Sequence, residues 1–126
     1  MKRIPVDIYR QEVLLFSSYK ELERYCKKED IDLEERSWDG LKASMEASEA
    51  MAGVLMYPDG SGAFYIALES ITLGNLLHEC IHGAFFILEN AGVEISFKNQ
   101  ESITYLSQYL FEEAVSKLKL IEVVDG

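Results

Sequence analysis

The sequence predicts an α+β fold in which a small, mostly antiparallel sheet packs on two long helices. Two patterns indicate this class. Short apolar runs rich in β-forming residues recur in the first half of the chain, whereas residues 71–90 and 100–120 carry apolar residues at helical spacing. The 126 residues suffice for one modest core. The sequence has no internal repeat and no linker-like segment, so we expect residues 1–126 to form a single domain.

The first part of the chain is expected to contain two strands and one or two helices. Apolar, β-forming residues at 4–9 and 13–16 predict the strands. Ser18 is followed three residues later by Glu21, a capping-box pattern that predicts a helix over 19–28. Good helix formers predict a second helix over 41–52, which Gly53 ends.

Two further strands are predicted over 54–57 and 63–69, because a run of turn-forming residues at 58–62 separates them. The second strand alternates. Phe64, Ile66 and Leu68 are expected to face one side of the sheet, and the residues between them the other side.

Two long helices are predicted in the second half. The first begins at 71 or 72 and ends at Asn90, where Gly92 is a typical stop signal. The second runs from about 100 to 120. Their apolar stripes are expected to be Leu77, Cys80, Ile81, Ala84, Leu88 and Ala91 in the first helix, and Ile103, Leu106, Leu110, Ala114 and Leu118 in the second.

The composition excludes several classes of protein. Hydrophobic residues make up 48% and charged residues 27%, which is typical of a globular chain. No apolar run is long enough to cross a bilayer, and the N-terminus lacks the apolar stretch of a secretory signal. Cys26 and Cys80 are too few for a disulfide framework and are expected to be buried core residues. We therefore expect a cytoplasmic protein that does not associate with membranes.

The charge is strongly acidic and unevenly distributed. Twelve basic residues oppose 22 acidic ones, for a net charge of −10, and the segment from Ala43 to Phe97 contains no Lys or Arg. Such a surface repels phosphate backbones, so we expect no binding to nucleic acid. It would favour a bound cation or a basic partner.

The only two histidines of the chain stand in the sequence His78-Glu79-Cys80-Ile81-His82, the HExxH pattern. On a helix, residues four apart lie one turn apart on one face, so both imidazoles can bind one metal ion. Glu79 is rotated by about 100° around the helix axis and can reach a water molecule beside the metal. Zinc lowers the pKa of a bound water toward ~7, and a carboxylate then takes its proton as the water attacks a carbonyl.

A catalytic zinc site has three protein ligands and one open position. Without a third histidine, the remaining ligand must be a carboxylate or a cysteine. Cys80 faces the opposite side of the helix, and Glu89 lies two turns beyond the pair. Glu101 lies 19 residues after His82, in the first turn of the next helix, which a turn at Gly92 can fold back. We therefore predict that His78, His82 and Glu101 bind Zn²⁺.

This pattern resembles the gluzincin class of zinc metallopeptidases, in which a glutamate on the following helix completes the site. More narrowly, residues 72–84 and 99–106 are similar to small phage-encoded metallopeptidase-like proteins, and the resemblance extends over about residues 54–115. It implies a minimal zincin-like domain, 1–126, that acts in a host cytoplasm on a peptide or protein substrate.

The resemblance also implies an edge strand before the HExxH helix, beside which an extended peptide binds. Residues 63–69 are expected to be that strand. In such sites a side chain beside the metal often donates a hydrogen bond to the developing oxyanion. Tyr105, four residues after Glu101, is the first candidate for this role, and Tyr65 and Tyr109 are weaker ones.

Three functional readings follow. The leading one is a zinc-dependent hydrolase that cleaves a peptide or amide bond, with Glu79 as the catalytic base. The alternative is a non-catalytic phage accessory or anti-defence binding protein that keeps a peptidase-like fold and metal site. A structural zinc site is the third reading, but the sequence offers no obvious fourth ligand to close it.

Overall fold

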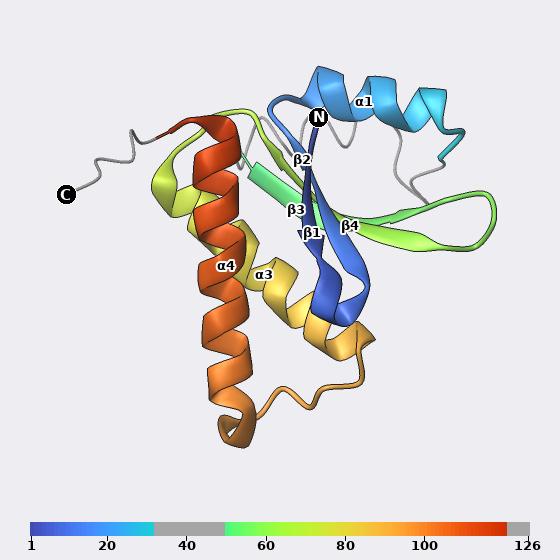
Figure 1. The fold of residues 1–126 in the computed structure, drawn as a ribbon. Helices are drawn as coiled ribbons and strands as arrows, with labels where there is room; N and C mark the ends of the chain where they lie inside the picture. The colour runs from blue at the N-terminus through green and yellow to red at the C-terminus, as the bar shows by residue number, and fades with distance from the viewer. Residues whose placement is uncertain (32–49, 121–126) are drawn as a thin grey trace.

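The computed structural model describes residues 1–31 and 50–120. Its four strands form one sheet in the order β1-β2-β4-β3 (Figure 1). Each edge strand pairs antiparallel with its neighbour, whereas the two central strands pair parallel, so the sheet is mixed. The strands are β1 (Lys2–Val6), β2 (Gln11–Phe16), β3 (Ala50–Met56) and β4 (Gly62–Leu68).

The described residues contain three α-helices: α1 (Tyr19–Lys28), α3 (Leu73–Asn90) and α4 (Gln100–Leu118). The predicted N-cap is confirmed, because the Ser18 hydroxyl accepts a hydrogen bond from the Glu21 N–H, whereas the Glu21 carboxylate binds Ser17 Oγ and the N-terminal ammonium and does not complete a capping box. Thr72 caps α3 in the same way as Ser18 caps α1. Gly92, at a φ of +78°, follows α3 in the left-handed conformation that ends many helices. None of these three helices has the length and apolar character needed to cross a membrane.

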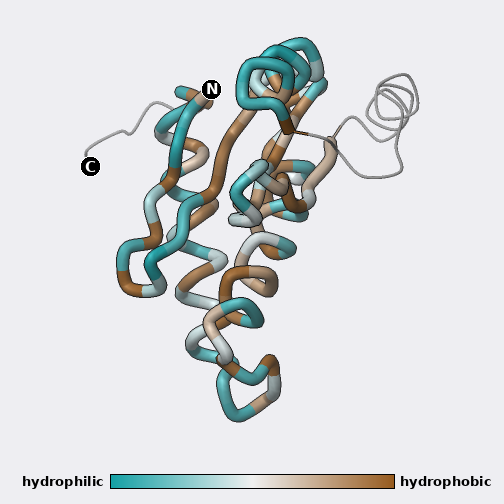
Figure 2. The backbone as a smooth tube through the Cα atoms, turned by 90° about the vertical axis from the view of Figure 1, so that its right-hand side faces the viewer, coloured by the Kyte–Doolittle hydropathy of each residue, from teal (hydrophilic) through white to brown (hydrophobic). Residues whose placement is uncertain are grey.

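The sheet lies between two helical layers (Figure 1). Helices α3 and α4 pack on one face, over Phe64, Ile66 and Leu68 of β4. Helix α1 packs on the other face, over Ala63, Tyr65 and Ala67. The predicted alternation of β4 is therefore confirmed. Because the central strands are buried on both faces, their sequences are almost continuously hydrophobic, which Figure 2 shows as brown stretches along the strands.

Several predicted bounds need correction. Residues 7–9 form a 3-10 turn, η1 (Asp7–Tyr9), and do not extend the first strand. The predicted helix over 41–52 is wrong at its end, because Ala50 already belongs to β3. The rest of that helix lies outside the described residues. The strand at 62–68 is central, so the prediction of an edge strand there is also wrong. Pairing with β2 decides this, and local sequence carries no information about that pairing.

The apolar stripes are confirmed in part. Cys80, Ala84 and Leu88 are buried in α3, as predicted, but Leu77 and Ile81 are 42% and 37% exposed. They border a shallow apolar pocket between α3 and α4, which Ile103 and Phe111 also line. The buried face of α3 is instead rotated toward Leu76 and Ile87, because the helix contacts both the sheet and α4.

At Gly83, helix α3 closely approaches the sheet and α4. A Cβ atom at this position would lie 3.1 Å from the Phe64 ring and 3.3 Å from Leu110, and both side chains are buried. A Cβ at Gly74, in the first turn of the same helix, would meet no atom within 4 Å. The two glycines lie in the same helix, but only Gly83 has close neighbours in the space that a Cβ atom would occupy.

We expect Gly74→Ala to raise the free energy of unfolding by about 0.5–1 kcal/mol, since alanine is the better helix former. Gly83→Ala should instead lower it by about 1 kcal/mol, because overpacking outweighs the same propensity gain. Urea denaturation of the two variants beside the wild type measures both changes. Equal stabilisation by both substitutions would contradict the close packing at Gly83.

Candidate metal centre

His78 and His82 lie one turn apart on α3, and both side chains are exposed. Their Nε2 atoms are 3.2 Å apart, and their ring centroids are 4.8 Å apart. Two nitrogens that bind one tetrahedral zinc ion at 2.0–2.1 Å are separated by about 3.3–3.4 Å. The two imidazoles therefore fit a single zinc ion through their Nε2 atoms. The same separation also fits a hydrogen bond between the rings when one Nε2 carries a proton.

Glu79 lies beside this pair and is only 8% exposed. It is the only buried charged side chain among residues 1–31 and 50–120. Burial raises the pKa of its carboxyl group, and the nearby imidazoles of His78 and His82 oppose that shift. No hydrogen bond or ion pair joins its side chain to another part of the described chain. Its carboxylate oxygens keep contact with solvent, because Ser96 Oγ is the only described side-chain polar atom that is fully buried without a hydrogen-bond partner. A largely buried carboxylate with a raised pKa that still reaches an open pocket is typical of functional groups.

Glu79 and His82 line a pocket of about 500 Å³ between α3 and the edge strand β3. Ala50 and Ala52 form its β3 side. Two aromatic rings that line it, Phe64 and Phe86, stack with their centroids 5.0 Å apart. The pocket thus combines aliphatic and aromatic side chains with an imidazole and the two carboxylates of Glu79 and Glu89.

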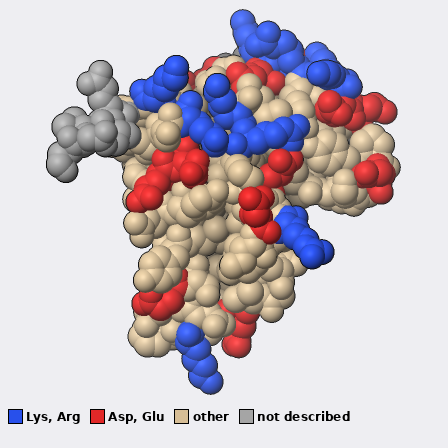
Figure 3. Space-filling model, in the orientation of Figure 1, with Lys and Arg blue, Asp and Glu red and all other residues tan. Residues whose placement is uncertain are grey.

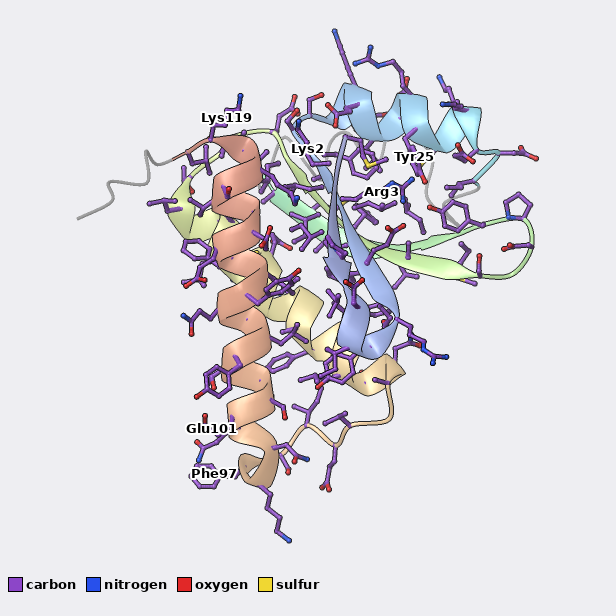
Figure 4. The ribbon with its side chains drawn as sticks, in the orientation of Figure 1. Lys2, Arg3, Tyr25, Phe97, Glu101 and Lys119 are labelled. Carbon is purple, nitrogen blue, oxygen red and sulfur yellow. The ribbon has the colours of Figure 1, made fainter. Side chains whose placement is uncertain are left out.

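The structure does not bring Glu101 to the histidine pair. Within the described part of the chain, no group of three or more His, Cys, Asp or Glu side chains is close enough to hold a metal ion. Glu101 is exposed in the first turn of α4, at the lower end of the helix in Figure 4. Gly83, next to His82, instead packs near Leu110. The nine residues from Glu101 to Leu110 correspond to about 13 Å along a helix.

The length of α3 explains this placement. The helix continues for eight residues beyond His82, to Asn90, which is about 12 Å. The chain then turns, and α4 must return by a similar length before it reaches the level of the histidines. The 19-residue spacing predicted from sequence is therefore too short for this pair of helices.

The three tyrosines predicted as oxyanion donors lie elsewhere. Tyr65 is buried on the opposite face of the sheet, in the core beneath α1. Tyr105 and Tyr109 line a different pocket, between α4 and η1. Cys26 and Cys80 are both fully buried and unpaired by disulfides, which agrees with the predicted core role.

Sequence reasoning missed the aromatic side of the site. Phe85 and Phe86 follow His82 by one turn and line the same pocket, together with Glu89. The sequence does carry a signal for these residues. Phe85, Phe86 and Glu89 lie three, four and seven residues after His82, and such spacings keep side chains near one side of a helix. Glu89 lies two turns beyond the histidine pair, which the sequence predicts is too far for metal binding, and the structure places it at the border of the pocket.

Comparisons with protein-family models, with curated proteins and with solved structures give no match to this chain. A functional conclusion therefore depends on the geometry of the site itself.

Proposed function

We propose that this protein is a zinc-dependent hydrolase of the gluzincin type, in which His78 and His82 hold the metal ion. The observation that carries the proposal is the 3.2 Å separation of their Nε2 atoms, which matches the bite of one zinc ion. When bound, zinc would polarise a carbonyl and acidify water. The predicted substrate is a peptide or another amide.

The position of Glu79 favours a catalytic role for the metal site over a structural one. Its carboxylate is buried beside the two imidazoles and has no competing hydrogen bond within the described residues. From there it can accept a proton from water and return it to a leaving amine. A purely structural metal site needs no such base.

The pocket supports a substrate of extended shape. One side of the pocket is the edge strand β3, which within the described residues has a strand neighbour, β4, on one side only. In this proposal the substrate is an extended peptide that lies along β3. The rings of Phe85 and Phe86 would then contact an apolar side chain of that peptide.

The missing third ligand favours a second candidate, a binding protein that keeps the histidine pair without catalysis. This is the non-catalytic phage accessory or anti-defence role named above. Glu101 remains the predicted third ligand of the hydrolase, which requires α4 to approach the pair more closely than in this structure. Tyr105, predicted as an oxyanion donor, lines a separate pocket and is not part of the proposed site.

Zinc content tests the proposal directly. Protein loaded with zinc, passed over a chelating resin and analysed for metal should contain about one zinc per chain. His78→Ala and His82→Ala should each lose most of it, whereas Glu89→Gln, which alters the pocket but not the pair, should retain it. Loss of zinc in Glu101→Ala would establish the third ligand. A wild-type protein without bound zinc would contradict the metal site.

A further inference from the structure

A second pocket lies between one face of α4 and η1, which forms the tip of the β1–β2 hairpin. Figure 1 shows this tip beside α4. The pocket has a volume of about 390 Å³ and shares no lining residue with the pocket at Glu79. Val6 and Leu106 form its apolar wall, and Tyr9, Tyr105 and Tyr109 line it with their rings. Asp7 supplies its only charged side chain.

Two of the three aromatic side chains of this pocket are open to solvent, whereas Tyr9 is half-buried against the core. Tyr105 is 67% exposed and Tyr109 is 37% exposed, and Ile8 beside them is 83% exposed. The Tyr109 hydroxyl donates a hydrogen bond to the Pro5 carbonyl, which ties α4 to β1 and fixes the position of the ring. Large aromatic groups left exposed around a cavity are typical of a binding site.

The charge of the pocket is negative. No Lys or Arg lines it, and within the described chain no cation forms an ion pair with Asp7. The pKa of Tyr109 is raised, first by burial and then by the carboxylates of Glu113 and Asp7, so both negative charges act at this position. Figure 3 shows that the basic side chains on this view are concentrated toward its upper end, near α1 and β1.

We propose that this pocket binds the cationic side chain, arginine or lysine, of a basic protein partner. The aliphatic stem of such a side chain would lie against Val6 and Leu106. Its cationic head would meet the ring faces of the tyrosines and the carboxylate of Asp7. The net charge of −10 would bring a basic partner to the surface. This inference does not depend on the proposed hydrolase activity, because the two pockets are separate.

A pair of short peptides tests this chemistry. Acetyl-Gly-Arg-Gly-amide carries the guanidinium, and its citrulline counterpart has almost the same shape without the charge. Each is titrated into ¹⁵N-labelled full-length protein and followed by NMR. We expect the arginine peptide to shift amides of residues 6–9 and 102–109 in a saturable manner, and the citrulline peptide to bind at least about tenfold more weakly.

Variants assign the binding to the pocket. Asp7→Asn should weaken binding of the arginine peptide about tenfold, because a charge-assisted hydrogen bond is lost. Asp30→Asn removes the same charge at the end of α1 and should change nothing. Tyr105→Leu should weaken binding, whereas Tyr105→Phe, which keeps the ring, should preserve it. Thermal unfolding of each variant confirms that it folds.

Three outcomes would overturn the proposal. Equal binding of both peptides would make the pocket a general apolar site. Shifts elsewhere on the protein, insensitive to Asp7→Asn, would mean that the peptide follows the diffuse negative charge alone. Amide shifts at 6–9 and 102–109 that depend on protein concentration without peptide would identify a second copy of this chain as the occupant.

Discussion

Replacing Glu79 by glutamine is expected to preserve zinc binding and to reduce hydrolysis by about 10²–10⁴-fold, the usual contribution of a general base. The change keeps the shape of the side chain and removes only its capacity to accept a proton. The histidine Nε2 atoms, 3.2 Å apart, do not involve Glu79 and should hold the metal as before.

A peptide library of mixed sequence, digested with zinc-loaded protein and analysed by mass spectrometry, measures this effect without a known substrate. His82→Ala is the control that should lose the metal and with it the cleavage. Glu89→Gln changes a carboxylate in the same pocket and should leave cleavage intact. Cleavage at wild-type rate by Glu79→Gln would contradict the role of Glu79 as base. A library left uncut by the wild type would favour the binding protein.

The stability of Glu79→Gln tests the role of this side chain independently of hydrolysis. Burial raises the pKa of the Glu79 carboxyl group, so its charged form is disfavoured in the folded protein without metal. Glu79→Gln should therefore unfold at the same or a higher urea concentration than the wild type when both are metal-free. A clear loss of stability would indicate that the carboxylate has a structural role.

We expect iodoacetamide to alkylate Cys26 about a thousandfold more slowly in the folded protein than in the unfolded chain. Its side chain is fully buried beneath α1, and burial raises the pKa of its thiol from 9.0 to about 12. The thiolate is the reactive form, and a shift of about three units lowers its population by about 10³ at pH 8.

The raised pKa of the Cys26 thiol also determines how the free energy of unfolding depends on pH. Below pH 9 the thiol is protonated in both states and contributes nothing to the difference. Above pH 9 the unfolded thiol ionises first, so the free energy of unfolding falls as the pH rises toward 12. Cys26→Ala should reduce this loss.

Intact mass measured during alkylation, in buffer and in guanidinium chloride, checks both the rate and its pH dependence. Cys80 is also fully buried, so we expect it to remain unmodified in the folded protein as well. Rapid labelling of either thiol in native buffer would contradict its place in the core. For Cys80, it would also reopen the possibility of a cysteine ligand on α3.

Local sequence patterns predicted the elements of this fold well. The Ser18–Glu21 capping-box pattern located α1 at 19–28, and the two long helical patterns located α3 and α4 within about two residues of their bounds. Capping and periodicity depend on neighbours in the chain, so a sequence carries them directly. The proximity of His78 and His82 is likewise predictable from sequence, because one turn of helix is enough to bring them together.

Tertiary structure decided the rest. Strand 62–68 became central because β2 pairs with it from fifty residues away, which left β3 as the edge beside Glu79 and His82. Glu101 lies far from the pair because α3 continues to Asn90 before the chain returns. The sequence by itself determined which side chains share a turn of helix. Contacts between elements determined which carboxylates and rings surround them, because strand order and helix crossing depend on packing that no local pattern encodes.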